Sequence, residues 1–155
     1  EDRREHAADG DVVARARDLE LGRDVALKLN PVRTMDEETR RAVAREAQAL
    51  ARLSHPHVVA VHSFGEATLN LGSRTIICLF IEMALIAGKS LRRWLKSKPP
   101  RAEILRVLEE AGSGLAAAHD TGLVHRDFKP DNIMIDESGR AFVVDFGLAK
   151  AEDPT

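Results

Sequence analysis

The segment 125–132 gathers ionisable and amide side chains in a short, turn-rich stretch of this 155-residue chain. It reads His-Arg-Asp-Phe-Lys-Pro-Asp-Asn, and Asp-Phe-Gly follows at 145–147. Asp127 in such a loop can accept a proton from a serine or threonine hydroxyl, while Lys129 neutralises a phosphoryl group in transit. Asn132 and Asp145 offer a neutral and a charged oxygen, which suit Mg²⁺. This set of side chains suits binding of a metal–polyphosphate and deprotonation of a hydroxyl.

A bland alternative exists for part of this segment. A His-Arg-Asp sequence by itself could simply form a turn in which the aspartate caps the backbone. A turn that only connects the apolar runs at 123–124 and 133–135 does not need so many ionisable groups. The spacing of Asn132 and Asp145 therefore favours the chemical interpretation.

Lys28 and Glu46 form a second candidate pair. Lys28 lies inside the apolar run 25–29, and a lysine is costly to bury without an anionic partner. Glu46 shares a helix face with Val43 and Leu50, so its carboxylate is expected to turn toward a sheet. Two alternatives remain open from these residues alone: a solvent-facing lysine on an edge strand, and an ordinary surface salt bridge.

The elements that must position these side chains follow from the apolar periodicity. The first half predicts an antiparallel sheet with one helix, after an irregular stretch at 1–10. Its strands are expected at 12–16, 25–29, 58–64 and 75–83, its helix at 36–53, and its turns at 21–24 and around Gly72.

The second half is expected to be largely helical. It predicts helices at 90–96 and 101–121, then strands at 133–135 and 141–144 joined by a turn at 136–139. The longer helix is expected to bury a stripe made of Ile104, Leu105, Leu108, Ala111, Leu115 and Ala118. Gly112 and Gly114 in it indicate close helix packing. A boundary near Gly88 then implies two lobes with a cleft.

Composition narrows the class of protein. Apolar residues make up 44% of the chain, which supplies a core, and a net charge of −2 argues against nucleic-acid or anionic-membrane binding. The single cysteine, Cys78, suits a reducing cytoplasm and is expected to be buried. His55, which precedes Pro56, is expected to close a turn rather than to bind a metal, and the histidines at 57, 62 and 119 show no metal-ligand spacing with Cys78. The apolar run 76–87 is too short to span a bilayer. Because the chain does not begin with methionine, we expect a fragment of a longer protein.

These motifs together resemble the protein kinase catalytic domain, and among its members the bacterial eukaryotic-like Ser/Thr kinases. The resemblance runs from about Val12 to Lys150. It rests on Val-Ala-Leu-Lys at 25–28, Glu46, His-Pro at 55–56, the loop 125–132 and Asp-Phe-Gly at 145–147. It implies an α+β, bilobal fold, with about 11–87 as the N-lobe and hinge and 88–155 as an incomplete C-lobe.

The resemblance also implies a role for each matched residue. Lys28 would hold the α- and β-phosphates of ATP, and Glu46 would hold Lys28. Asp127 would be the catalytic base, Lys129 would stabilise the γ-phosphoryl group, and Asn132 and Asp145 would bind Mg²⁺. Lys129 further implies transfer to protein serine or threonine rather than tyrosine.

The adenine site is implied by position in the same way. The segment 83–86 would be the hinge, with Met83 as gatekeeper and the backbone of Ala84 and Ile86 reading the adenine edge. Val13, Ala26 and Met134 would sandwich the ring, and their apolar side chains suit that place.

Two departures from the family pattern stand out. The segment 7–12 has one glycine and two aspartates where a glycine-rich phosphate loop is expected, which would weaken nucleotide binding. The sequence stops soon after Gly147, before the remainder of an activation segment. We therefore expect the 155-residue chain alone to be poorly stable and to phosphorylate little peptide.

Two alternative functions follow from these departures. One is a pseudokinase or nucleotide-binding regulatory module, favoured by the altered phosphate loop and opposed by the intact Lys28, Asp127 and Asp145. The other is a small-molecule phosphotransferase of the aminoglycoside-kinase type. The Lys-Pro pair at 129–130 and the Phe-Gly pair at 146–147 oppose it.

Overall fold

The computed structural model describes residues 5–6, 12–31 and 36–147, and their backbone falls into two units. The first unit holds strands β1 to β5 and helix α1. The second unit holds the segment Arg52–Ala60 and all elements from β6 onward. Residues 7–11, where the sequence departs from a glycine-rich phosphate loop, and residues 148–155 lie outside the described residues.

The first unit is built on one antiparallel sheet. Its strands lie in the order β1-β2-β3-β5-β4, so β3 and β5 occupy interior positions. Their bounds are β1 Glu5–His6, β2 Val12–Asp18, β3 Arg23–Pro31, β4 Val61–Leu71 and β5 Arg74–Ala84. The expectation of an irregular stretch at 1–10 was wrong for β1, whose backbone pairs with the start of β2.

The β2–β3 hairpin turns at residues 19–22, two residues earlier than expected. The Asp18 carboxylate accepts hydrogen bonds from the backbone N–H groups of Glu20 and Leu21, each at 3.0 Å. Gly22 then takes the left-handed φ of 63° that ends the turn. The β4–β5 hairpin uses Gly72 as predicted, with φ of 62°.

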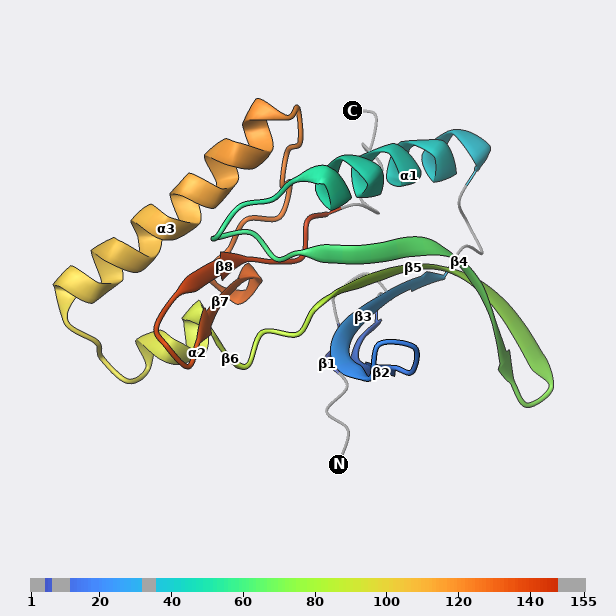
Figure 1. Ribbon diagram of the computed structural model, residues 1–155, viewed down its shortest axis with the longest axis horizontal. Coiled ribbons are helices and arrows are strands. Elements are labelled where there is room, and N and C mark those ends of the chain that lie inside the picture. Colours follow the sequence, from blue (N-terminus) through green and yellow to red (C-terminus); the bar gives the residue numbers. More distant parts are fainter. Residues whose placement is uncertain (1–4, 7–11, 32–35, 148–155) are drawn as a thin grey trace. The chain divides into compact units, whose positions relative to one another are not determined.

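Helix α1, Glu37–Arg52, forms where the sequence predicts it. Asp36 caps its first turn by accepting a hydrogen bond from the N–H of Thr39 at 2.7 Å. Its buried residues are Val43, Ala47 and Leu50, at helical spacing. In Figure 1 the helix runs along β4, and an ion pair between Arg40 of α1 and Glu66 of β4 joins the two.

The second unit combines helices with a small sheet of order β6-β7-β8. Its elements are β6 Gly88–Ser90, α2 Leu91–Leu95, α3 Arg101–Asp120, the 3₁₀ turn η1 Pro130–Asn132, β7 Ile133–Asp136 and β8 Ala141–Val143. Gly139 closes the β7–β8 hairpin with φ of 85°, which confirms the predicted turn.

The segment 58–60 does not belong to the strand that the sequence predicted at 58–64. Strand β4 begins only at Val61, and Val58 instead forms a parallel bridge to Val143 of β8. The Val59 N–H donates to the Val143 carbonyl at 3.0 Å, and the Val143 N–H donates to the His57 carbonyl at 2.8 Å. Val58 and Val59 bury their side chains in the second unit, which explains why their apolar run resembled one continuous strand.

Helix α3 packs through a different face from the one expected. Its buried residues are Val107, Ala111, Gly114 and Ala118, whereas Leu105 and Leu108 are 50% and 45% exposed. The predicted buried stripe was therefore wrong at Leu105 and Leu108 and is confirmed at Ala111 and Ala118. The reason lies at Gly114, where a Cβ atom would stand 2.5 Å from the His57 carbonyl oxygen. Absence of a side chain there lets the segment Arg52–Ala60 approach the helix backbone.

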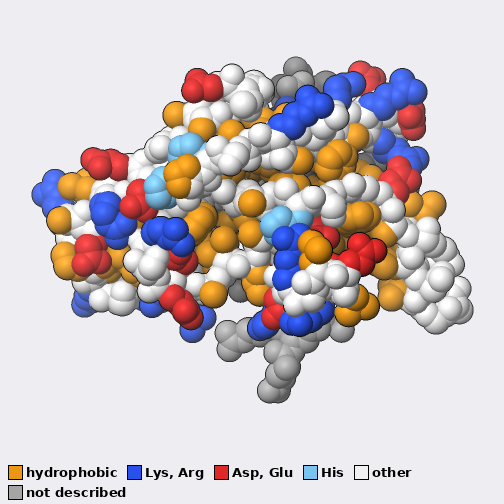
Figure 2. All heavy atoms as spheres, in the orientation of Figure 1, with side chains coloured by type: hydrophobic (Ala, Val, Ile, Leu, Met, Phe, Trp, Pro, Cys, Tyr) orange, Lys and Arg blue, Asp and Glu red, His pale blue; other side chains and the backbone are white. Residues whose placement is uncertain are grey.

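Charged side chains are interspersed by sign on the face of the protein that Figure 2 shows, in keeping with the net charge of −2. Lys and Arg lie next to Asp and Glu there. Within the described residues, no helix combines the length and apolar character needed to span a bilayer. Cys78 is buried, as predicted.

The two glycines of α3 predict opposite responses to alanine. Gly112 was expected to pack closely, but a Cβ there meets nothing within 4 Å. Gly112→Ala should therefore stabilise the protein by about 0.5–1 kcal/mol through helix propensity. Gly114→Ala should destabilise it by about 1–3 kcal/mol, because the new methyl group overlaps the His57 carbonyl. Urea denaturation of both variants measures these changes, and equal changes at the two positions would contradict this packing.

Candidate functional site

In the first unit, strand register gathers four of the predicted nucleotide-site residues on one sheet face. Lys28 of β3 pairs directly with Val13 of β2, and Ala26 pairs directly with Met83 of β5. Directly paired residues share a face, as do residues two apart on a strand. Val13, Ala26, Lys28 and Met83 therefore lie on the same face.

Lys28 is only 4% exposed on the interior strand β3. The interpretation of Lys28 as a solvent-facing edge-strand residue was wrong. A cation at this depth has lost most of its hydration, so this position suits a site for an anionic group.

Helix α1, which carries Glu46, covers the same sheet face. Glu66 of β4 lies on the face of Lys28, because it pairs with Leu79 and Leu79 pairs with Asn30, two residues after Lys28. Since Glu66 is ion-paired with Arg40 of α1, the helix lies over that face. Glu46 is partly buried there, among the buried residues of the helix.

Of the predicted hinge residues, Met83 and Ala84 end strand β5 in the first unit, and Ile86 begins the longer of the two chain segments of the second unit. Met83 is 8% exposed, and Ala84 and Ile86 are partly buried. Met134 lies on β7 in the second unit, partly buried and paired with Ser90 and Phe142. The predicted nucleotide residues are thus divided between the two units.

In the second unit, two predicted residues, Asn132 and Lys129, converge on the carboxylate of Asp127. The Asn132 side-chain amide donates from Nδ2 to the Asp127 backbone carbonyl at 2.9 Å and to Oδ2 at 3.2 Å. Lys129 Nζ lies 3.2 Å from the same Oδ2. Asn132 is 6% exposed, whereas Asp127 and Lys129 have 24% and 44% of their side chains exposed. The base, the lysine and the amide therefore form one cluster at a solvent-accessible loop.

His125 joins this loop to the segment that carries Asp145. Its Nδ1 accepts a hydrogen bond from the Asp127 N–H at 3.2 Å, and its Nε2 lies 2.8 Å from the Val144 carbonyl. These partners require a neutral ring with the proton on Nε2. The ring is 2% exposed and packs on Phe146 with centroids 4.6 Å apart. His125 is a structural connector between two chemical segments.

Backbone strain marks Arg126 of the 125–132 loop and the candidate metal ligand Asp145. Arg126 and Asp145 have φ of 64° and 55°, in the left-handed region that non-glycine residues seldom adopt. Such conformations cost about 1–3 kcal/mol each and persist where the surroundings fix them. The Gly147 N–H donates to the His125 carbonyl at 3.0 Å and the Val144 N–H to the Asn132 carbonyl at 3.0 Å, so both sides of Asp145 are held.

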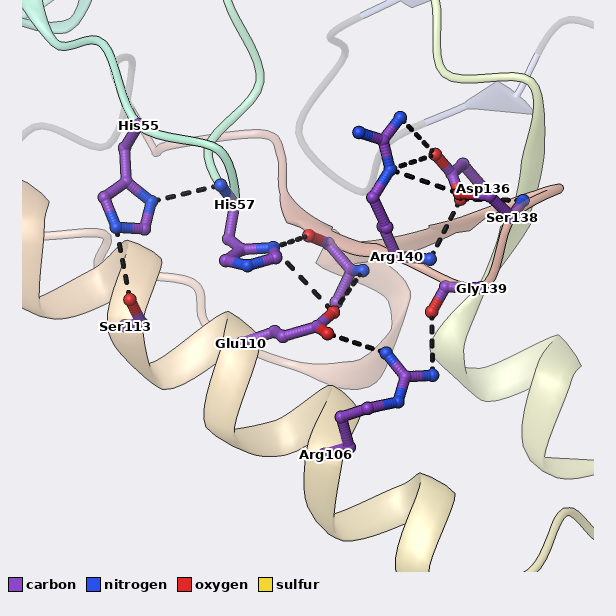
Figure 3. A network of polar contacts seen from close by, with 10 residues as sticks. His55, His57, Arg106, Glu110, Ser113, Asp136, Ser138, Gly139 and Arg140 are labelled. Atoms are coloured by element: carbon purple, nitrogen blue, oxygen red, sulfur yellow. Dashed lines mark hydrogen bonds and ion pairs between the residues drawn. The ribbon is translucent and has the colours of Figure 1, made fainter.

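Two groups of contacts were missed by sequence reasoning. Arg92 of α2 donates from Nε to Asp131 of η1 at 2.7 Å, and their separation of 39 positions gives no local signal. A second network, drawn in Figure 3, links α3 to β8 through Arg106, Glu110 and His57. Only the i,i+4 spacing of Arg106 and Glu110 was visible in the sequence.

The network of Figure 3 anchors the segment Arg52–Ala60 to α3 and β8. Glu110 accepts the Ala141 N–H at 2.9 Å and an Arg106 guanidinium N–H at 2.6 Å. His57 Nδ1 lies 2.8 Å from the Ala141 carbonyl, and His55 Nε2 lies 3.1 Å from the Ser113 hydroxyl. Burial raises the pKa of Glu110, but the hydrogen bonds from Ala141 and Arg106 outweigh it and lower that pKa overall.

Metal-ligand geometry is absent from the histidines of the described residues. His55 closes a turn, as predicted, because its Nδ1 accepts the His57 N–H at 3.0 Å. No group of three or more His, Cys, Asp or Glu side chains in the described part of the chain is placed to hold a metal ion.

Comparison with known proteins decides the family. The sequence profile described as "Protein kinase domain" matches residues 9–155. The chain belongs to the protein kinase domain family. The matched region includes every candidate residue described above in either unit.

Three relatives of this kinase domain come from Mycobacterium tuberculosis and Myxococcus xanthus. It is 39% identical over 146 residues to serine/threonine-protein kinase PknD of Mycobacterium tuberculosis, covering 92% of this chain and 21% of the relative. It is 40% identical over 139 residues to PknA of the same organism, covering 88% and 32%. Serine/threonine-protein kinase pkn3 of Myxococcus xanthus is 39% identical over 150 residues, covering 92% and 26%. The chain thus spans about a fifth to a third of the length of these relatives.

The turn after β7 predicts a pH-dependent contribution to stability. Burial raises the pKa of Asp136, but hydrogen bonds from Ser138 and Arg140 outweigh it and lower that pKa to about 2. A lowered pKa means that the stabilisation is present above the unfolded value of 3.8 and is lost as the pH falls toward 2.

Asp136→Asn should therefore reduce the free energy of unfolding by about 1–2 kcal/mol at pH 7, and less between pH 4 and pH 2. Denaturation as a function of pH measures this difference. Glu137→Gln in the same turn is the control, because that side chain is exposed. A constant difference across the pH range would contradict this role of Asp136.

Proposed function

We propose that this kinase domain transfers the γ-phosphoryl group of ATP to serine or threonine hydroxyls of proteins, as a cytoplasmic enzyme. The observation that carries the proposal is the convergence of Lys129 and Asn132 on Asp127 Oδ2, each at 3.2 Å. A base, a cation and an amide at one accessible carboxylate meet the requirements of phosphoryl transfer to a hydroxyl.

Asp127 acts as the base in this proposal. The contacts from Lys129 and Asn132 fix the orientation of its carboxylate, and the His125 ring holds the backbone N–H of the same residue. The substrate hydroxyl gives its proton to Asp127 as its oxygen attacks the γ-phosphorus of ATP. The bond from that phosphorus to the β–γ bridging oxygen breaks, and ADP leaves. Lys129 stands next to the base, where it counters the negative charge of the transferring group.

The first unit holds the nucleotide in this proposal. Lys28 is the buried cation for the α- and β-phosphates, and Glu46 of α1 is its anionic partner. Val13, Ala26 and Met83 share the sheet face of Lys28, so the apolar surface for an adenine ring adjoins the phosphate position. Met134 supplies apolar surface from the second unit, and the backbone of Ala84 and Ile86 reads the adenine edge.

Asn132 and Asp145 fit a Mg²⁺ ion by their chemistry. Mg²⁺ prefers oxygen ligands and is bound through one or two side chains together with substrate phosphates. The Asn132 amide nitrogen is turned to Asp127, so the carbonyl oxygen at its other end is the atom offered as a ligand. Asp145 would supply the second oxygen ligand, from a backbone position with φ of 55° that is held by hydrogen bonds on both sides. When bound, Mg²⁺ would neutralise phosphate charge and orient the γ-phosphoryl group.

Loss of the base tests the transfer step. Asp127→Asn in the protein as its gene encodes it should lower kcat by about 10²- to 10⁴-fold, because the amide cannot accept the hydroxyl proton. Transfer of ³²P from ATP to a serine- or threonine-containing protein measures the rate. His119→Gln is a control at an exposed histidine of α3. Normal transfer by Asp127→Asn would defeat the assigned role.

Loss of each anion- or metal-binding residue tests the nucleotide site. Lys28→Met should weaken binding of ATP with or without Mg²⁺, because it removes the buried cation. Asp145→Asn should weaken binding only when Mg²⁺ is present, because it alters a metal ligand. Calorimetric titration with ATP and Mg·ATP separates the two effects. Binding of Mg·ATP without any phosphoryl transfer by the wild type would instead indicate a nucleotide-binding regulatory module.

A further inference from the structure

We propose that Arg92 is a positioning residue that keeps Lys129 on the catalytic carboxylate by neutralising a competing one, Asp131. The inference rests on the proposed function, because it assigns a purpose to the place of Lys129. It concerns a charge pair that joins Asp131 of the 125–132 loop to Arg92, a residue outside the motifs.

Two carboxylates flank Lys129 in the sequence. Asp127 precedes it by two residues and Asp131 follows it by two. Lys129 Nζ is 3.2 Å from Asp127 Oδ2, so Asp127 is the partner that it takes. Lys129 also acts electrostatically on Asp131 and contributes to lowering its pKa. Lys129 therefore lies within the electrostatic reach of both carboxylates.

Arg92 occupies the second carboxylate. Its Nε donates to Asp131 Oδ1 at 2.7 Å, and this hydrogen bond is the largest cause of the lowered pKa of Asp131. With a guanidinium on Asp131, the attraction of that carboxylate for Lys129 is largely cancelled. Lys129 therefore stays paired with Asp127, the position that phosphoryl transfer would require.

Arg92 is itself held in place by the structure around it. It is the second residue of α2, after Leu91, which is 3% exposed. Ser90 caps the helix by accepting the Arg93 N–H at 3.3 Å. Helix α2 also packs against β6, β7 and η1. The guanidinium thus comes from a supported position rather than from a free loop.

The η1 turn alone does not keep the charges apart. It is one 3₁₀ turn, Pro130–Asn132, and its N-cap residue Lys129 makes no side-chain capping bond. Asn132 fixes the inner side of the turn through Asp127. Asp131 lies on the outer side, with 42% of its side chain exposed, and Arg92 is its partner there. A single 3₁₀ turn has weak hydrogen-bond geometry, so it does little to hold Asp131 away from Lys129. The contact with Arg92 is what offsets the charge of Asp131.

The test is a double-mutant cycle in the protein as its gene encodes it. Arg92→Gln should lower kcat about fivefold, the rate equivalent of a partly exposed charge pair, with the KM for ATP unchanged. Asp131→Asn should change kcat less than about twofold, and Arg92→Gln combined with Asp131→Asn should recover nearly the wild-type kcat. Arg93→Gln on the same helix is the matched control, because Arg93 is exposed and its backbone N–H, not its side chain, bonds to Ser90.

Several outcomes would overturn the proposal. If Asp131→Asn is as harmful as Arg92→Gln and the double variant is not rescued, the pair acts as a tether and not as a neutraliser. An unchanged kcat in Arg92→Gln would also overturn it. Raising the salt concentration should reduce the Arg92→Gln defect, because the released attraction between Lys129 and Asp131 is screened. A defect that grows with salt would contradict the argument.

A measurement independent of activity separates this proposal from the proposed function. A crystal structure of Arg92→Gln should show Lys129 Nζ displaced from Asp127 toward Asp131, whether or not the protein transfers phosphate. An unmoved Lys129 would overturn the inference while leaving the proposed function intact. Conversely, absence of transfer by the wild type would defeat the proposed function, and the position of Lys129 would still decide the role of Arg92.

Discussion

The buried carboxamide of Asn132 is the constraint on which the second unit's chemistry depends. Its nitrogen holds both the backbone carbonyl and the carboxylate of Asp127, and its own backbone carbonyl accepts the Val144 N–H. One residue thus ties the loop of the base to the strand that leads to Asp145. Because the group is 6% exposed, water competes little with these hydrogen bonds. The loop can therefore hold left-handed backbone at Arg126 and Asp145.

In the first unit the equivalent constraint is strand register. The period of two along β3 and direct pairing with β2 and β5 place Lys28 beside Val13 and, two residues away, Ala26 beside Met83. A slip of one residue in either pairing would turn one partner to the other face. The buried position of Lys28 and the helix over its face both follow from that register. Backbone hydrogen bonds, rather than side-chain contacts alone, thus order these candidate residues of the first unit.

The sequence predicts elements and local pairs better than it predicts faces and distant pairs. Helix α1 and strand β3 carry strong periodicity and clear end signals, so Lys28 and Glu46 were assigned to the right elements. Helix α3 carries apolar residues on two faces. The face with Gly114 is buried instead of the face with Leu108, because a glycine lets another backbone approach. Val58 and Val59 satisfy a strand pattern but pair with Val143. The pair of Arg92 and Asp131 depends on a fold that brings distant positions together, which periodicity does not encode.

The path of the chain has a consequence for how this domain can vary. The backbone leaves the first unit after Ala51, returns to it after Ala60 and leaves again after Leu85. The short segment Arg52–Ala60 belongs to the second unit but lies between two stretches of the first unit in the sequence. It is hydrogen-bonded to β8 and α3. Neither unit can therefore be exchanged by recombination as one uninterrupted gene segment. A chimera that takes residues before 86 from one kinase and residues after 86 from another would pair the segment Arg52–Ala60 of the first with β8 of the second. His57, Gly114 and Val143 would therefore have to come from the same parent.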